Sequence, residues 1–226
     1  MKHDLLPNTL IVFTSDNGPW HVMRDHGGSA GGLREGKMFT FDGGMRVPTV
    51  AMWPAGIKPG QTYRDVAVMT DWMTTVAEIT GASLPDDRTY DGETLVPVFS
   101  GEGSRAGNTF LYYNADNMAL EGFREGDWKI KLPYKGFPGA RYKRKVAPHP
   151  LLLINLREDP GELHNLAAQM PEKVETMLAA MNADHATKLP FPPRIPLRSP
   201  ADETHYQHLN EKYGKKSGIT RVFLEI

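Results

Sequence analysis

The residues best suited to chemistry come directly after a short apolar run near the N-terminus. Asp16 and Asn17 follow residues 8–14, whose β-branched and apolar side chains predict a buried strand. In open α/β sheets, ligands bind in the crevice at the carboxyl ends of the strands. A carboxylate beside an amide carbonyl offers two hard oxygen ligands, which suit Ca²⁺ or Mg²⁺. Because Asp-Asn-Gly is also a common turn sequence, a metal site and a simple capped turn both remain open.

A glycine-rich segment follows, and its residue types could bind an anion. Residues 27–44 contain seven glycines, too many for a helix or a regular strand. Lys37 lies inside this segment, where glycines let backbone N–H groups approach an anion and a lysine adds positive charge. His26, just before it, could donate a hydrogen bond to the same anion. The alternatives are a solvated lysine and a histidine that caps the loop.

The composition excludes several kinds of site and partner. The chain has 226 residues, of which 26 are Lys or Arg and 27 are Asp or Glu. The net charge of −1 gives no general attraction to nucleic acid or to an anionic membrane. The absence of cysteine excludes disulfides, thiolate metal sites and a cysteine nucleophile. The apolar runs fall far short of the ~20 residues that cross a bilayer, so we expect no membrane span and no signal peptide.

The elements that must position these residues indicate an α/β layer. The strand within residues 8–14, the glycine-rich loop, a second strand within residues 46–53 and a helix over residues 71–80 follow one another. Asp71 is suited to cap this helix, and Gly81 is suited to end it. The expected fold class is therefore α/β.

A second, smaller domain is predicted where the composition changes, and we place the domains at residues 1–105 and 106–226. Residues 101–107 are rich in glycine and polar side chains, as at a boundary. Beyond them the pattern predicts successive strands at residues 109–113, 118–124, 128–132 and 151–156. A helix is expected over residues 171–185, so this part reads as a small antiparallel α+β domain with an extended tail.

Four motifs follow one another around the glycine-rich segment. They are Thr14-Ser15-Asp16-Asn17-Gly18-Pro19, Asp25-His26-Gly27-Gly28-Ser29-Ala30-Gly31, Leu33-Arg34-Glu35-Gly36-Lys37 and Asp42-Gly43-Gly44-Met45-Arg46-Val47-Pro48. Together they resemble the sulfatase family, because their order and spacing match over roughly 35 residues, which chance would rarely produce. The resemblance continues to about residue 185 through Thr70-Asp71, Asp91-Gly92-Glu93-Thr94-Leu95, Arg124-Glu125-Gly126-Asp127-Trp128-Lys129 and Leu156-Arg157-Glu158-Asp159-Pro160-Gly161-Glu162.

The resemblance implies a fold, a metal and roles for the site residues. The fold would be the C-terminal part of an alkaline-phosphatase-like sheet domain followed by a small antiparallel α+β domain. A divalent cation, Ca²⁺ or Mg²⁺, would be bound by two distant segments, of which Asp16 and Asn17 match the second. Lys37 matches the lysine that binds the substrate sulfate, and His26 is the second catalytic candidate. One minor departure is Asp42, where the family more often has Glu.

The larger departure concerns the nucleophile. The family nucleophile is a formylglycine made from the first residue of a Cys/Ser-x-Pro-x-Arg motif, and no serine here begins such a motif. We therefore interpret the chain as a C-terminal fragment, and we expect the formylglycine in a missing N-terminal part. The chain alone is expected to be inactive. For a full-length enzyme the resemblance implies a periplasmic or secreted location.

The leading hypothesis is hydrolysis of a sulfate ester, with two alternatives left open. One is a phosphodiesterase or phosphonate hydrolase of the same superfamily. The other is a non-catalytic sulfated-sugar-binding module that uses the Lys37 loop and the basic cluster at residues 141–145. The expected partner is a sulfate-ester small molecule or a sulfated carbohydrate, with no nucleic acid and no membrane. An uncovered sheet edge at residues 10–13 and 50–53 would also permit self-association.

Overall fold

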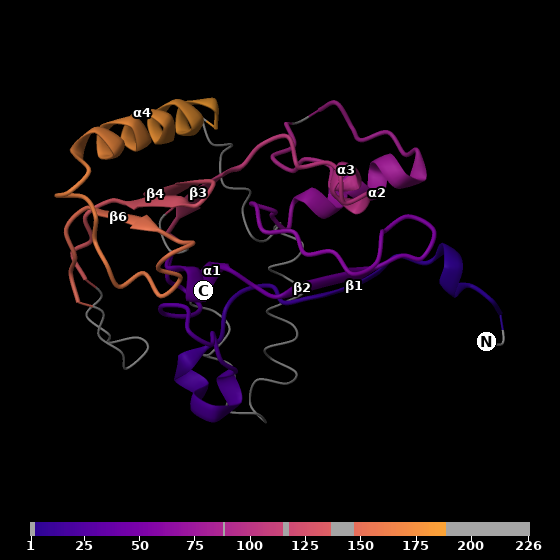
Figure 1. Cartoon of the computed structure of the whole chain (residues 1–226), viewed down its shortest axis with the longest axis horizontal. Helices are drawn as coiled ribbons and strands as arrows, with labels where there is room; N and C mark the ends of the chain where they lie inside the picture. The colour runs from indigo at the N-terminus through magenta and orange to yellow at the C-terminus, as the bar shows by residue number, and fades with distance from the viewer. Residues whose placement is uncertain (1–2, 88, 115–117, 137–146, 189–226) are drawn as a thin grey trace, which may run out of the picture. The chain divides into compact units, whose positions relative to one another are not determined.

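A computed structural model describes residues 3–87, 89–114, 118–136 and 147–188 (Figure 1). Residues up to Thr187 form one unit of the chain, and Lys188–Ile226 forms a second that lies almost wholly outside the described residues. The tail predicted after residue 188 and the basic cluster at residues 141–145 therefore lie outside the described residues as well. Among the helices that are described, none is both long enough and apolar enough to span a bilayer.

The first two strands form an antiparallel pair. β1 (Ile11–Thr14) and β2 (Thr49–Met52) are hydrogen-bonded so that Ile11 lies opposite Met52 and Phe13 lies opposite Val50. Side chains two residues apart share a face of a strand, so these four apolar side chains lie on one face. We call them the apolar ribbon face. The prediction of two strands is confirmed, but the prediction that the first is buried is wrong, because Phe13 is 72% exposed.

The later strands form a four-stranded antiparallel sheet with one helix over it. Its strand order is β3-β4-β5-β6, and α4 packs against β3, β4 and β5 (Figure 1). The core between them is apolar and includes Phe123, Ile130, Leu153 and Met177. The elements are β3 (Thr109–Tyr113), β4 (Leu120–Glu125), β5 (Trp128–Lys131), β6 (Leu152–Asn155) and α4 (Pro171–Thr187). Each lies within about two residues of its predicted bounds, so the antiparallel α+β prediction is confirmed.

The opposite face of this sheet is also buried, and it carries charged residues. Ile130 faces the core below α4, so its neighbours Lys129 and Lys131 point the other way, where they are 0% and 2% exposed. The short helix α1 (Asp42–Met45) and the residues just before it cover this face. Phe41 packs there against apolar side chains of β6. The glycine-rich segment is therefore joined to the sheet that follows much later in the chain.

The stretch of sequence between β2 and β3 contains α2 (Asp71–Thr80), α3 (Val96–Phe99) and a buried arginine, Arg105. Gly81 ends α2 with a left-handed φ of 69°, as predicted. Asp71 is not the cap, since that position is Thr70; it is the first helical residue. Its carboxylate accepts hydrogen bonds from the backbone of Val68 and pairs with Arg105 at 2.9 Å. The division into domains 1–105 and 106–226 stays a prediction.

Candidate functional site

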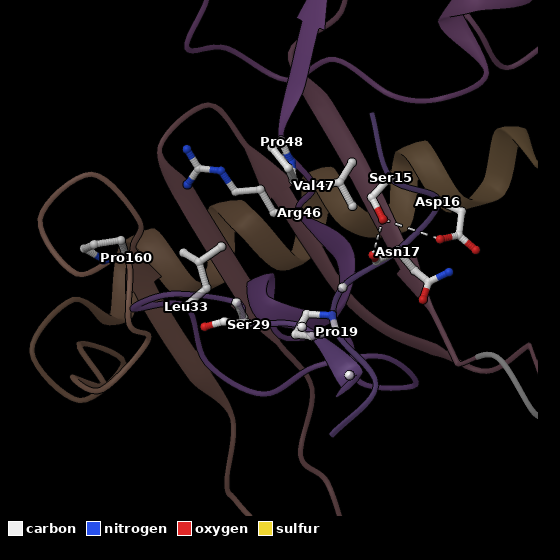
Figure 2. Close-up of a pocket in the computed structure, with 14 residues that line it drawn as sticks. Ser15, Asp16, Asn17, Pro19, Ser29, Leu33, Arg46, Val47, Pro48 and Pro160 are labelled. Carbon is white, nitrogen blue, oxygen red and sulfur yellow. Dashed lines mark hydrogen bonds between the residues drawn. The ribbon is translucent and has the colours of Figure 1, made fainter. Parts of the chain in front are cut away.

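A cavity of about 810 Å³ opens beside the turn that follows β1 (Figure 2). One wall is this turn, from Ser15 to Pro19, and a second wall comes from residues 27–30 of the glycine-rich segment. Residues 46–48, which lead into β2, complete it together with Pro160. The cavity is therefore lined both by the turn that bears Asp16 and Asn17 and by part of the glycine-rich segment, the two regions suited to ligand binding by their residue types.

Asp16 and Asn17 both line this cavity, in the turn just beyond the last residue of β1. The Ser15 hydroxyl donates to the Asn17 carbonyl at 3.0 Å and lies 3.5 Å from Oδ1 of Asp16 (Figure 2). Ser15 thus organises the turn, while the Asp16 side chain is exposed. The turn and the ligand pair, treated as alternatives from the sequence, are compatible in one structure.

The donor set fits part of a Ca²⁺ or Mg²⁺ site. Asp16 offers a carboxylate and Asn17 an amide carbonyl, both oxygen ligands of the kind these cations take. Ca²⁺ commonly takes about six to eight oxygens. Among the described residues, no group of three or more His, Asp or Glu could hold a metal. Within the described residues, Asp16 and Asn17 therefore account for only part of the ligand set that such a cation takes.

Lys37 and His26 are not among the residues that line the cavity. Lys37 is half-buried, with Nζ 5.9 Å from the ring centre of Trp20. Its backbone N–H donates to the Pro19 carbonyl at 2.9 Å, which ties it to the turn that bears Asp16. His26 is exposed in a 3₁₀ segment, η2 (His21–Gly27). The structure thus groups Asp16 with Asn17 on the cavity and links Lys37 to the same turn through its backbone.

The glycines of this region are needed for close backbone packing. A Cβ on Gly18 would lie 1.8 Å from the Gly43 carbonyl oxygen, and one on Gly43 would lie 2.3 Å from the Arg34 oxygen. The Gly18 N–H donates to the Gly44 carbonyl at 3.0 Å. No larger residue fits where backbones approach this closely. The sequence interpretation gave these glycines only an anion-binding role, but packing alone requires several of them.

Three charged residues that the sequence interpretation missed form a buried cluster beside α1. Lys129 Nζ lies 2.8 Å from Oδ1 of Asp42 and 2.7 Å from Oε1 of Glu162. Each of the three is at most 1% exposed. The Asp42 N–H donates to Oε2 of Glu162 at 2.6 Å. We call Asp42, Lys129 and Glu162 the buried ion cluster.

The cluster keeps Lys129 charged. Burial lowers the pKa of Lys129, but the nearby Tyr112, Asp42 and Glu162 raise it by more, so the net pKa lies above its ordinary value. Burial raises the pKa of Glu162, and Lys129 partly offsets this. A buried cation that retains its proton requires these partners, because an unpaired charge in the interior is strongly destabilising. The sequence carries one signal of this cluster, because Lys129 and Lys131 flank the apolar Ile130 in a predicted strand and must therefore lie on the opposite face from it.

Lys131 lies on the same face of β5 but has different partners. Its Nζ donates to Oγ1 of Thr40 at 2.5 Å and lies 4.5 Å from the ring centre of Phe41. Burial, followed by repulsion from Lys129, lowers the pKa of Lys131 to about 7. The pKa values of the two lysines are thus shifted in opposite directions, and only Lys129 forms ion pairs with carboxylates.

Comparison with known proteins covers most of the described chain. Residues 35–187 match the family model described as N-sulphoglucosamine sulphohydrolase, C-terminal. The chain is 36% identical to arylsulfatase A of Bos taurus over 199 residues, which is 83% of this chain and 39% of that protein. It is 40% identical to steryl-sulfatase of Homo sapiens over 216 residues, which is 84% of this chain and 37% of that protein.

Solved structures share the fold. The PsFucS1 sulfatase from Pseudoalteromonas sp. has a TM-score of 0.69 and 27% identity, covering 83% of this chain and 38% of that one. Ps i-CgsB in complex with k-i-k-neocarrahexaose has a TM-score of 0.64 and 25% identity, covering 80% and 37%. The predicted α/β fold class is confirmed by this likeness. The chain spans less than two fifths of the length of each of these relatives.

Replacing Gly18 should show that the turn and α1 are packed backbone to backbone. We expect Gly18→Ala to lower the free energy of unfolding by about 1–3 kcal/mol, because its Cβ would overlap the Gly43 carbonyl. Gly32→Ala is the control, since no heavy atom lies within 4 Å of its added Cβ, and its effect should stay within about 0.5 kcal/mol. Urea unfolding measures both, and equal effects would contradict the packing described.

The pKa of Lys131 predicts a stability that depends on pH. An unfolded lysine has a pKa of about 10.4, whereas burial lowers the pKa of folded Lys131 to about 7. Between these values the unfolded state holds a proton that the folded state has lost, so the free energy of unfolding rises with pH. Lys131→Met should remove this rise, and the exposed Lys58→Met should keep it. Urea unfolding between about pH 7 and 10 checks this, and parallel curves for wild type and Lys131→Met would refute it.

Proposed function

Because the chain belongs to the sulfatase family, we propose that it is the C-terminal portion of a sulfuric ester hydrolase, which converts a sulfate ester and water into an alcohol and sulfate. The observation that supports this most directly is the cavity lined by Asp16 and Asn17, with Lys37 hydrogen-bonded through its backbone to the same turn. The wall of this cavity thus carries two candidate cation ligands, and the lysine-bearing segment is tied to that wall without lining it. These are the charges needed to hold a sulfate group.

In this proposal the residues of the chain bind and orient the sulfate. Asp16 and Asn17 would hold a divalent cation, Ca²⁺ or Mg²⁺, through their side-chain oxygens. When bound, the cation supplies Lewis acidity to the sulfate oxygens. Lys37 would stabilise the negative charge that develops as the S–O bond breaks. His26 is exposed near the cavity wall formed by Gly27 and is available as a second hydrogen-bond donor.

The nucleophile would come from a different part of the protein. The chain contains no cysteine, and no serine begins the Ser-x-Pro-x-Arg pattern from which formylglycine is made. We therefore propose that the 226 residues alone do not hydrolyse sulfate esters. The phosphoryl-transfer alternative has no observation in its favour, since the relatives described above are sulfatases.

A sulfated carbohydrate is the proposed substrate class. The fold neighbour Ps i-CgsB was solved with k-i-k-neocarrahexaose, an oligomeric ligand. In this chain the cavity extends past Asp16 and Asn17 to Arg46 and Pro160, which lie on its opposite side (Figure 2). That length gives room for more than the sulfate group alone, and Arg46 could contact a second anionic or hydroxyl substituent.

The test of this function compares the chain alone with a fusion in which a nucleophile-bearing sulfatase segment precedes residue 1. We expect aryl-sulfate turnover only in the fusion. There, Asp16→Ala should lower the Ca²⁺ content found by elemental analysis, because it removes a charged ligand. Lys37→Ala should lower kcat by about 10²–10³ while the metal stays bound, since in this proposal its ammonium contacts the sulfate and not the metal.

Two further variants calibrate this test. Asn17→Ala should be milder than Asp16→Ala, because a neutral carbonyl contributes less to holding a dication than a carboxylate. Lys58→Ala, which removes an exposed lysine, should leave kcat unchanged. Turnover by the unfused chain, retained metal in Asp16→Ala, or full activity in Lys37→Ala would each show that the roles are assigned wrongly.

We also propose that the apolar ribbon face drives association of the isolated chain. Phe13 and Val50 lie side by side across β1 and β2, and they are 72% and 64% exposed. Exposed apolar strand faces and edges favour association. Phe13→Lys should therefore shift sedimentation towards monomer, whereas Leu163→Lys, at a side chain 76% exposed elsewhere, should not. A wild-type chain that is monomeric at high concentration would contradict the proposal.

A further inference from the structure

None of the three members of the buried ion cluster lines the cavity, although Asp42 lies 4.0 Å from the lining residue Arg46, and hydrogen bonds connect the cluster to both segments of the site. We propose that Lys129 is a positioning residue, which holds the Asp16–Asn17 turn and the Lys37 segment in place through Asp42 and Glu162. This inference rests on the proposed roles of Asp16, Asn17 and Lys37. It assigns to the four-stranded sheet a part in the geometry of the site.

The buried charges of the cluster are matched only when Lys129 lies next to both Asp42 and Glu162. Lys129 is fully buried on β5, and its ammonium lies within 2.8 Å of a carboxylate oxygen on each of its two partners. Such buried ion pairs add little net stability, because desolvation offsets most of the attraction. Removing one member, however, leaves uncompensated charge in the interior. The cluster therefore selects a position for the Asp42 carboxylate more than it strengthens the fold.

Asp42 connects the cluster to the site because it is the first residue of α1, and the next two residues of α1 are hydrogen-bonded to the site segments. The next residue, Gly43, donates its N–H to the Arg34 carbonyl at 2.8 Å, three residues before Lys37. Gly44 accepts the Gly18 N–H at 3.0 Å, directly after Asn17. The backbones at Gly18 and Gly43 approach their neighbours so closely that a Cβ at either position would overlap a carbonyl oxygen. Each of the two site segments is thus hydrogen-bonded to α1.

A second connection starts from Glu162. Its backbone carbonyl accepts a hydrogen bond from Nη1 of Arg34 at 2.8 Å, and the Arg34 guanidinium stacks 4.0 Å over the ring of Phe41. The Lys37 segment is therefore held from both carboxylate members of the cluster. Lys129 is thus connected to the Lys37 segment by two routes, one through Asp42 and α1 and one through Glu162 and Arg34.

Backbone hydrogen exchange followed by NMR can test this in the 226-residue chain without substrate. In Lys129→Met, we expect the Gly18 and Lys37 amides, which donate to the Gly44 and Pro19 carbonyls, to exchange about 10-fold faster or more. Met177→Ala is the matched control: it destabilises the core of the same sheet but does not touch the cluster. In that variant these two amides should exchange as in wild type.

Each outcome decides the question. Unchanged exchange at Gly18 and Lys37 in Lys129→Met would overturn the proposal. Equal acceleration in Met177→Ala would also overturn it, because general loss of stability would then suffice. If Lys129→Met does not fold, Glu162→Gln decides in its place, since its one amide oxygen can still accept from the Asp42 N–H while the carboxylate that faces Lys129 is lost. Faster exchange at the two amides would support positioning, and normal exchange would refute it. Failure of the fusion to hydrolyse sulfate esters would count against the proposed function and leave this result untouched.

Discussion

A lysine ammonium buried in the interior must be matched by nearby anions, and this requirement organises the chain around Lys129. Its two carboxylate partners come from positions far apart in sequence, 42 and 162, so the charge can be matched only when α1 and the loop after β6 meet over β5. The apolar residues on the same face, Phe41 and those of β6, pack around this meeting point.

Regular elements could be predicted because each leaves a local signal. The alternation in β5 and the spacing in α4 depend on neighbouring residues, and Gly81 signals a helix end through its own backbone preference. The exposure of Phe13 could not be predicted in the same way, because burial depends on what covers a strand. The run at β1 looks like a buried strand whether or not a second layer lies over it. The prediction that Asp71 caps α2 was wrong for a similar reason, because its carboxylate pairs with Arg105, which lies 34 residues away in the sequence.

The candidate site was predictable in its residue types and less so in its geometry. Asp16 and Asn17 lie on the cavity because a strand end places them there, which is a local property. Lys37 belongs to a segment whose path is determined by contacts with α1 and with the turn after β1, so its place could not follow from the sequence near it. The buried ion cluster could not be predicted because its three members lie far apart in sequence, at positions 42, 129 and 162, and no local pattern links them.

The glycines in and near the glycine-rich segment fall into two groups that differ in whether a larger residue can replace them. Gly18, Gly36 and Gly43 have backbone atoms within 2.5 Å of where a Cβ would be, so these positions are closed to other residues. Gly32 meets nothing within 4 Å, and Ser29 and Ala30 beside it form part of the cavity wall. Natural drift or library design could therefore diversify this short stretch of wall while the supporting backbone stays constant. Such a separation lets one scaffold acquire new ligand preferences without refolding its frame.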